Sequence, residues 1–416
     1  MLYEKPEFIT ESLLDVDFYK FSMLRFIFTF YRGTKVEFSF TNRTKGICIA
    51  DVVDEEELRR ELEHACTLRF TEAELAYIAS DPRLNDPAFI EFLRNYRLPK
   101  LSIKKDHKNG TYRIYARGRW ERVSHWETIV LHTVSELYMR SFLKGKTPEE
   151  IEAIYAEGDG RLTQKIEFFN THPEIYFVEM GTRRRFGRLW QEHDIVRFVN
   201  ECPKNILGTS NVYFAMKLGI RAIGTMAHEL FMGLLALRMD MNDPSSVVRS
   251  QREVLANWRK LYGEELSCAL TDTLGTDHFF NEVLEPEDAK LWKSFRQDSG
   301  SPYECGEKVI AFYERNGIDA SKRTMVASDG LVAEKMADIV AYFKGRLNVI
   351  FGWGTNATND LGFAALSLVM KLVVAEGRST VKLSDNLAKA IGEMKIVEWV
   401  KMVCGYVNTY SEQLVY

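Results

Sequence analysis

After about residue 140 the chain repeats one unit, which is a short apolar run, a turn rich in Gly, Thr, Ser and Asp, and usually a helical pattern. Seven such strand–turn sequences occur. Their turns are residues 181–185, 208–211, 224–229, 271–277, 298–302, 328–330 and 352–356. Strands that alternate with helices form right-handed βαβ units around a parallel sheet. The second part of the chain is therefore restricted to α/β folds.

The polar residues of every unit follow the strand, so they lie at its carboxyl end. In a (β/α) barrel these ends meet at one mouth, where the active site is built. A doubly wound sheet needs functional residues only near a switch point in its strand order. Seven decorated turns therefore favour a (β/α) barrel, which we assign to residues 136–375.

The first part of the chain has a different texture. Residues 35–40 alternate between polar and apolar side chains, and residues 101–118 read as a hairpin folded at Asn109-Gly110, a dipeptide that readily supplies two positive φ angles. Residues 54–95 are charged and periodic, as expected of amphipathic helices. We therefore expect an N-terminal α+β domain over residues 1–135, joined by residues 376–416.

Composition excludes several classes of protein. The 416 residues are 46% hydrophobic and carry a net charge of −4, which allows a large core but gives no basic field for nucleic acid. The chain contains no run of about 18 consecutive apolar residues, so no membrane span is predicted. The first 15 residues do not resemble a signal peptide. The six cysteines are scattered without a CxxC pair, a pattern typical of reduced thiols in a cytoplasmic protein.

The turns combine basic, hydroxyl and acidic groups. Glycines and hydroxyls at helix N-termini present N–H groups to an oxyanion, and arginines add charged donors in a fixed fork. Aspartates on the same rim suit sugar hydroxyls or a divalent cation. Together they indicate a phosphorylated sugar held with Mg²⁺.

Common nucleotide and zinc motifs are absent. His228-Glu229 begins like HExxH, but residue 232 is Met, so the second zinc ligand is missing. Gly145-Lys146-Thr147 lacks the upstream glycine of a P-loop, because Arg140 stands there. Taken singly, Arg183–Arg185 would be an ion-paired surface run and His228 a buried structural histidine. The functional interpretation therefore rests on all seven turns lying on the same side.

Ten motifs occur together in a characteristic order. They are SLLDVDFYKFSM (12–23), FTNRT (40–44), GTRRRF (181–186), GTSN (208–211), GTMAHE (224–229), LTDTLGTDHF (270–279), RQDSG (296–300), SDG (328–330), FGWGTN (351–356) and VKLSDN (381–386). Over nearly its whole length the chain resembles the nicotinate phosphoribosyltransferase family. The resemblance implies a type II phosphoribosyltransferase fold, in which an irregular (β/α) barrel stands beside an α+β sandwich-like domain, and a homodimer with a shared active site.

The resemblance also implies an activity. Such an enzyme transfers phosphoribosyl from 5-phosphoribosyl-1-diphosphate to nicotinate, giving nicotinate mononucleotide and diphosphate in the salvage of nicotinate toward NAD. ATP is expected as a co-substrate, hydrolysed through a phosphohistidine, as in a ligase-class enzyme. Mg²⁺ is expected with the diphosphate, and no direct metal ligand is assigned. Neither nucleic acid nor membrane is expected as a partner.

Roles pass to individual residues through the matching motifs. His228 is expected to carry the phosphoryl group, and Arg296 and Asp298 to act on the phosphoribosyl moiety. Tyr19, supplied by a partner subunit, is expected to stack on the pyridine ring beside Arg183. The other expected substrate-binding residues are Thr209, Ser210, Thr225, Asp329, Gly330, Gly352, Gly354 and Thr355.

Selectivity for the acid is assigned to Ser210. Related nicotinamide-using enzymes resemble this motif but have an aspartate there, which would repel a carboxylate. A transferase for nicotinamide or quinolinate is the alternative, and a ligand sensor without turnover or a sugar isomerase is a more distant one. The chain departs from the family pattern at Met180, Gly187, Gln297 and Trp353.

Overall fold

The strand–turn units after residue 140 form one parallel sheet in the computed structural model, which describes residues 6–408. Its strands are β4 (Phe177–Glu179), β5 (Ile206–Thr209), β6 (Cys268–Leu270), β7 (Ser294–Gln297), β8 (Thr324–Ala327) and β9 (Asn348–Trp353), in the order β5-β4-β9-β8-β7-β6. All five pairings are parallel. The α/β part of the fold prediction is confirmed.

A degenerate strand lies between the two ends of this sheet. Residues 221–223 were expected to form a strand, but they make only a single parallel bridge, from Ala222 to Thr209 of β5. On the other side, the Thr225 hydroxyl donates to the carbonyl of Cys268, 2.6 Å away, at the start of β6. The barrel is therefore irregular, as the resemblance implied.

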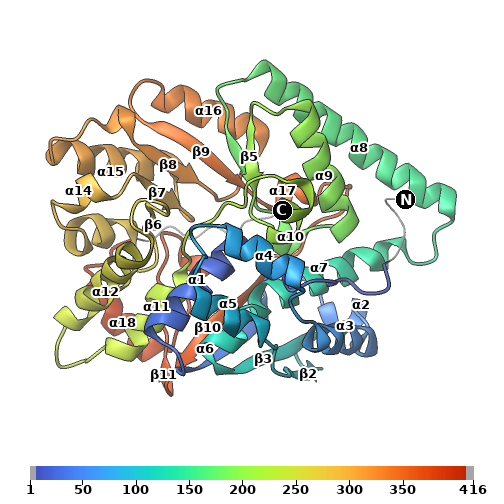
Figure 1. Cartoon of the computed structure of the whole chain (residues 1–416), viewed down its shortest axis with the longest axis horizontal. Coiled ribbons are helices and arrows are strands. Elements are labelled where there is room, and N and C mark those ends of the chain that lie inside the picture. The colour runs from blue at the N-terminus through green and yellow to red at the C-terminus, as the bar shows by residue number, and fades with distance from the viewer. Residues whose placement is uncertain (1–5, 409–416) are drawn as a thin grey trace.

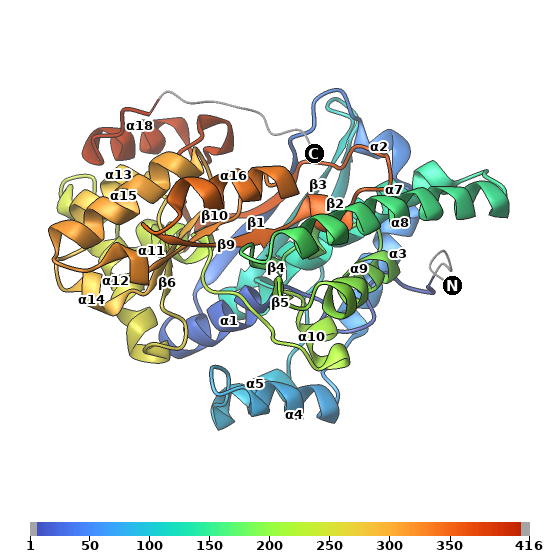
Figure 2. The same cartoon turned by 90° about the horizontal axis from the view of Figure 1, so that it is seen from above.

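Helices surround the parallel sheet (Figures 1 and 2). They are α8 (Pro148–Thr171), α9 (Arg188–Glu201), α10 (Val212–Leu218), α11 (His228–Arg238), α12 (Ser245–Tyr262), α13 (Thr276–His278), α14 (Asp288–Leu291), α15 (Pro302–Arg315), α16 (Ala333–Phe343) and α17 (Thr355–Thr358), with short turns η1 (Thr182–Arg184), η2 (Phe279–Val283, π-helical) and η3 (Ala320–Lys322). Local sequence fixes where several begin. In α8, Thr147 and Glu150 form a reciprocal capping box, and Pro148 suits the first helical position.

The second sheet is antiparallel and has five strands. They are β1 (Lys35–Asn42), β2 (Ser102–Asp106), β3 (Thr111–Arg119), β10 (Leu368–Ala375) and β11 (Arg378–Ser379), in the order β11-β10-β1-β3-β2. The predicted strand at 35–40 is confirmed, with Val36, Phe38 and Phe40 buried. At the turn of the predicted hairpin, Gly110 has a positive φ but Asn109 does not, and the Asn109 side chain donates to the Asp106 carboxylate.

The remaining elements pack around this second sheet. They are α1 (Phe18–Phe30), α2 (Ile49–Val52), α3 (Glu55–Thr67), α4 (Glu72–Ser80), α5 (Pro87–Arg94), α6 (Trp120–Val123), α7 (Trp126–Leu143), η4 (Leu387–Lys389) and α18 (Met394–Val403). The helices predicted over 54–95 are present as α3, α4 and α5. Val400 of α18 is buried in a small cluster with Leu235 of α11 and Val247 of α12.

The chain returns to the antiparallel sheet earlier than the predicted boundary at residue 376. β10, assigned to the barrel on sequence, pairs with β1 along seven residues. Because β10 also packs against α7 and α11, it lies where the two sheets' layers meet. Among residues 6–408, no helix has both the length and the apolar composition needed to cross a bilayer.

Candidate active site

A cavity of about 550 Å³ opens at the carboxyl ends of β4, β8 and β9 and is walled on its other side by β10 and the segment that follows it. A narrower cavity of about 70 Å³ continues from it toward α1 and α11. The two share Arg183, Asp298, Gly352 and Gly354 as walls. They therefore form one continuous site, with a wide end and a narrow end.

Glycines make one wall of the wide end. A Cβ atom at Gly352 would lie 2.8 Å from the Met180 sulfur and 3.0 Å from Cβ of Ser328, so only glycine lets the backbone pass there. Gly354 caps α17, which starts at Thr355. Asp329 and Gly330 line the same end from the turn after β8. The backbone N–H groups of these residues and the Thr355 hydroxyl can cradle an oxyanion.

Basic side chains form the opposite wall. They are Arg43, Lys45, Lys371, Lys382 and Lys389, and all five come from the antiparallel part of the molecule or the segment after it. Lys389 donates to the Asp298 carbonyl (2.9 Å) and to the Asp329 carboxylate (2.6 Å). Burial lowers the pKa of Lys382 to about 8, and the cations Lys371 and Lys389 add to the shift.

These five residues were not predicted from the sequence to belong to the site. Arg43 and Lys382 lie inside motifs quoted for the resemblance, so their positions were marked but their roles were not. Lys371 stands alone in an otherwise apolar strand, LVMKLVVA. A single lysine in such a strand is a signal that was available from sequence.

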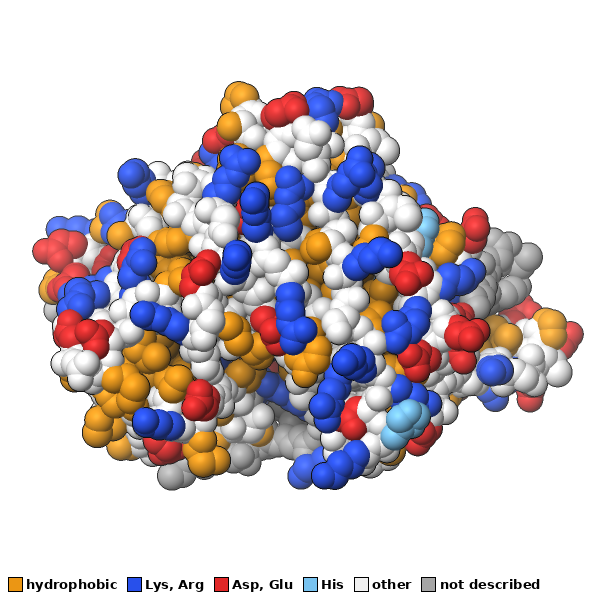
Figure 3. Space-filling view, turned by 90° about the horizontal axis from the view of Figure 1, so that it is seen from below, with side chains coloured by type: hydrophobic (Ala, Val, Ile, Leu, Met, Phe, Trp, Pro, Cys, Tyr) orange, Lys and Arg blue, Asp and Glu red, His pale blue; other side chains and the backbone are white. Residues whose placement is uncertain are grey.

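The face of the molecule seen from below carries side chains of both charges (Figure 3). Figure 3 shows Lys and Arg side chains spread across that face, with acidic and apolar groups among them. The overall charge of −4 agrees with this mixture. Attraction of an anion therefore depends on the cavity's own walls.

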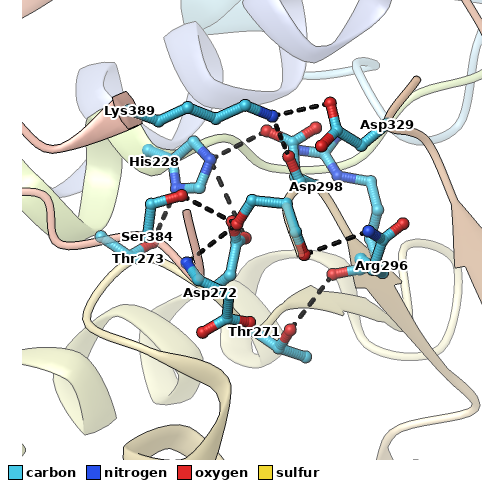
Figure 4. Close-up of polar contacts among 12 residues, drawn as sticks. His228, Thr271, Asp272, Thr273, Arg296, Asp298, Asp329, Ser384 and Lys389 are labelled. Carbon is cyan, nitrogen blue, oxygen red and sulfur yellow. Dashed lines mark hydrogen bonds and ion pairs between the residues drawn. The ribbon is translucent and has the colours of Figure 1, made fainter. Parts of the chain in front are cut away.

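His228 is the first residue of α11, and it is 3% exposed. Its Nε2 lies 2.9 Å from the Asp298 carboxylate and its Nδ1 lies 3.0 Å from the Thr273 hydroxyl (Figure 4). Burial lowers the pKa of the imidazole to about 4, helped by Lys382 and opposed by the two nearby aspartates. The ring is therefore neutral near pH 7. Because an ionised carboxylate only accepts, Nε2 carries the proton and Nδ1 the lone pair.

Two aspartates flank this histidine, and their pKa values shift in opposite directions. Burial acts to raise the pKa of Asp298, but Arg296 and His228 outweigh it and hold that pKa well below its usual range. Asp272 is fully buried, 3.9 Å from His228 Nε2, and burial raises its pKa. It accepts a hydrogen bond from Ser299. Sequence analysis gave Asp298 a catalytic role and did not assign Asp272.

The narrow end is lined by Tyr19, Arg183, Ser210, His228 and Arg296. The Arg183 guanidinium lies 5.6 Å from the Tyr19 ring centroid, within cation–π range. Both residues belong to the same chain, so the structure brings Tyr19 to the site without a partner subunit.

Two predicted residues lie outside both cavities. The Thr209 hydroxyl donates to the buried Glu179 carboxylate at 2.5 Å, and the Thr225 hydroxyl donates to Cys268. The Thr209 bond joins the end of β5 to the end of β4, and the Thr225 bond joins the segment after residue 223 to the start of β6. The other predicted site residues line one cavity or both.

A divalent cation fits the acidic side of the wide end. His228, Asp272 and Asp298 present ligand atoms within 4.8 Å of one another, but Mg²⁺ prefers oxygen ligands and keeps several waters. Asp298 and Asp329 line the cavity, whereas Asp272 is fully buried. These two partly buried carboxylates line the cavity and are therefore the protein groups that would face a Mg²⁺ carried by a diphosphate.

Comparison with known proteins gives a consistent result. Residues 175–408 match the model of the nicotinate phosphoribosyltransferase (NAPRTase) family, and residues 14–135 match its N-terminal domain. A nicotinate phosphoribosyltransferase structure from Vibrio cholerae is 30% identical, with a TM-score of 0.85 over 98% of this chain and 95% of that one. One from Porphyromonas gingivalis is 29% identical, with a TM-score of 0.83 over 95% of this chain and all of the other.

Proposed function

The chain belongs to the nicotinate phosphoribosyltransferase family, and we propose that its continuous basic site is where it carries out that reaction. The enzyme joins nicotinate to 5-phosphoribosyl-1-diphosphate and releases nicotinate mononucleotide and diphosphate, a step of NAD salvage. One observation carries the assignment of the site: an oxyanion cradle and a narrow end lined by Tyr19, His228 and Arg296 meet at the shared walls Arg183 and Asp298.

The wide end suits the phosphoribosyl diphosphate. Gly352, Gly354 and Thr355 can hold the 5-phosphate through N–H and hydroxyl donors, and Asp329 can accept from ribose hydroxyls. Lys371 and Lys382 face the same space and can neutralise the diphosphate as its charge grows on departure. Mg²⁺, when bound with the diphosphate near Asp298 and Asp329, would add to this neutralisation.

The narrow end suits the base. Tyr19 offers a ring face, and Arg183 a cation for the carboxylate. Nicotinate already has a free lone pair on its ring nitrogen at neutral pH, so the transfer needs orientation and leaving-group stabilisation, not a general base. We place the anomeric carbon beside Arg296, which lines the narrow end near Asp298.

ATP coupling is proposed to run through His228. The neutral imidazole can attack the γ-phosphorus of ATP and release ADP, and water then removes the phosphoryl group from the histidine. The phosphohistidine adds about −1.5 to −2 charges beside Lys382 and Asp298. This local change of charge can alter the affinity of the basic wall for the diphosphate.

An assay of diphosphate release tests the proposal. Nicotinate, nicotinamide and quinolinate are each supplied with 5-phosphoribosyl-1-diphosphate, with and without ATP. Nicotinate should be preferred, and ATP should increase its turnover. His228→Ala should abolish ATP hydrolysis and leave a slow transfer that ATP does not stimulate.

The matched control is His172→Ala, at the end of α8, which should hydrolyse ATP normally. Unchanged ATP hydrolysis by His228→Ala would remove this histidine from the coupling.

A homodimer is part of the proposal through the family resemblance. Because Tyr19 reaches the narrow end of its own chain, we do not assign it to a neighbouring subunit's site. Sedimentation equilibrium of the enzyme should give twice the mass of 48.1 kDa. A single-chain mass would contradict the dimer and leave the assignment of the site intact.

A further inference from the structure

Besides Asp298, a second aspartate lines the narrow end of the site. It lies next to Ser210, the residue to which selectivity was assigned from the sequence. Asp17 is 1% exposed and lines the narrow cavity. Its Oδ1 accepts the hydroxyl hydrogen of Ser210 at 2.7 Å, and its Oδ2 lies 3.3 Å from Nε of Arg183. Among the described residues, nothing donates a hydrogen bond to Oδ2.

This arrangement changes the role that the Ser210 hydroxyl can have toward a ligand. Its only hydrogen is already given to Asp17, so the hydroxyl offers lone pairs, and not a donor, to an incoming carboxylate. Arg183 is also shared with Asp17. With Asp17 ionised, a nicotinate carboxylate would meet a like charge that competes for both of its expected partners.

We propose that nicotinate enters this end only with one proton, taken from solvent and held by Asp17, so that Asp17 sets the preference between acid and amide as the pH changes. The proposal rests on the placement of nicotinate in the narrow end. The protonated Oδ2 then donates to the nicotinate carboxylate, and Oδ1 keeps the bond from Ser210. Nicotinamide, which carries no charge, needs no such proton.

The surroundings of Asp17 favour the neutral acid. Burial raises the pKa of Asp17, and Glu127 adds to the shift, while Arg183, Ser210 and Lys20 oppose it. The other titratable or charged groups around the narrow end are Tyr19, His228, Arg296, Asp298 and Lys371. The bound carboxylate adds one more negative charge, which raises the pKa of Asp17 further.

The sign of the pH dependence follows. Nicotinate stays anionic from pH 5.5 to 9. Once the pH exceeds the pKa of Asp17 in the free enzyme, each nicotinate brings in one proton, so its dissociation constant rises up to about tenfold per pH unit. Nicotinamide should show no such rise. The ratio of nicotinate to nicotinamide affinity therefore falls as pH increases.

Isothermal titration calorimetry of the wild-type enzyme tests this without any substitution. Nicotinate, and separately nicotinamide, is titrated without ATP in buffers of different ionisation enthalpy between pH 5.5 and 9. Proton uptake should approach about one per nicotinate at the upper end of this range and stay near zero for nicotinamide. No uptake with nicotinate at any pH would overturn the proposal.

Asp17→Asn locates the proton. Its amide oxygen can still accept from Ser210, and its NH₂ group can donate to the ligand, so nicotinate affinity should become independent of pH with no proton uptake. Lys382, with a pKa of about 8, and Glu179, with a pKa of about 7, also titrate in this range. Uptake that persists in Asp17→Asn would come from such a group and would overturn the proposal.

Glu179→Gln is the matched control, because Glu179 lies at the end of β4 and lines neither cavity. It should take up the same number of protons as the wild type. Turnover of nicotinate is measured alongside, so that an enzyme active on nicotinate without proton uptake refutes the role of Asp17 and leaves the proposed function standing.

Discussion

Three consecutive arginines follow β4, and each side chain meets a different environment. Arg183 is 38% exposed and reaches the narrow end of the site, and Arg184 lines the wide end. Arg185 is fully buried and holds both oxygens of Asp15 at 2.7 and 2.8 Å. The run GTRRR therefore supplies two walls of the cavities and one buried ion pair.

Substitutions at the two ends of this run should separate the roles. Arg185→Ala leaves Asp15 buried without its cation, which should cost about 3–5 kcal/mol of unfolding free energy. Arg183→Ala should change that free energy by less than about 1 kcal/mol and raise the KM for nicotinate. Urea unfolding and steady-state kinetics measure the two effects. Equal destabilisation by both substitutions would refute the division.

Glu179 is a buried carboxyl group that links three segments. It accepts hydrogen bonds from the Gly181 N–H, the Gln191 amide and the Thr209 hydroxyl. Burial raises the pKa of Glu179 to about 7, against the lowering effect of these bonds. The folded state thus keeps a proton that the unfolded state loses above its ordinary pKa.

Stability should therefore fall as the pH rises from about 4.5 to 7 through this group. Glu179→Gln, whose amide reproduces the hydrogen bonds of the protonated acid, removes that slope. It should match the wild type near pH 4.5 and exceed it at pH 8 by on the order of 2–3 kcal/mol. Urea unfolding at both pH values measures the difference. A difference that does not change with pH would contradict the assignment.

Sequence could identify hydroxyl-bearing turns but not where each hydroxyl points. Thr209 and Ser210 are neighbours in one turn, yet Thr209 points to Glu179 and Ser210 to Asp17. The partner that decides the direction comes from a distant segment in both cases. The same holds for Thr225, which is directed by Cys268.

At the scale of elements, α11 is the helix that places His228. Its second residue, Glu229, accepts from Trp120 (2.6 Å), from Ser124 (2.7 Å) and from Lys20 (2.6 Å), all buried. One turn later, a Cβ at Gly233 would lie 2.3 Å from the Trp120 ring. The position of the histidine therefore depends on close contact between α11 and the Trp120 indole.

Gly233→Ala should push Trp120 away and disturb the bond to Glu229. We expect a loss of about 1–3 kcal/mol in unfolding free energy and a fall in ATP hydrolysis at temperatures where the variant stays folded. The control is Gly160→Ala in α8, where nothing described lies within 4 Å of the added methyl group. That variant should be unchanged or up to about 1 kcal/mol more stable. Calorimetry and an ATPase assay compare the two.

Periodic elements were the predictable part of the fold. Helix caps, alternating strands and the turns at the carboxyl ends of strands depend on residues that are neighbours in the sequence. For this reason β1, α15 and the six strands of the parallel sheet could be predicted from the sequence. Residues 221–223 were predicted to form a strand because a turn of the repeated kind follows them, but the barrel closes there by a single bridge and one hydrogen bond from a threonine. Such closure depends on strands far away in the sequence.

At the scale of the whole molecule, the site has walls from both sheets. The parallel sheet supplies the glycine turns, and the segment from β10 to η4 supplies Lys371, Lys382 and Lys389. The turns were predictable because they repeat. Lys371 stood out in its apolar strand, but the place of the three lysines at this site was not predictable, because the pairing of β10 with β1 brings that segment across the mouth of the barrel.

Lys382→Ala tests this two-sided construction. Loss of one charged contact is worth about 1.5–3 kcal/mol, so the KM for 5-phosphoribosyl-1-diphosphate should rise about 10- to 100-fold. The KM for nicotinate should change little, because Lys382 does not line the narrow end. Lys204→Ala, at an exposed position after α9, is the control. A larger rise in the KM for nicotinate than in the KM for 5-phosphoribosyl-1-diphosphate would contradict the placement of Lys382 at the wide end.

The pairing of β1 with β10 also has a consequence for biosynthesis. Partners such as Phe40 and Met370 are separated by more than 300 residues, an interval that a ribosome needs roughly 15 to 65 s to translate. During that time one edge of β1 has no strand to bond, and the basic wall of the site lacks Lys371, Lys382 and Lys389. The nascent polypeptide is thus catalytically silent and exposed to aggregation until its late strand arrives, which makes it a natural client for chaperones.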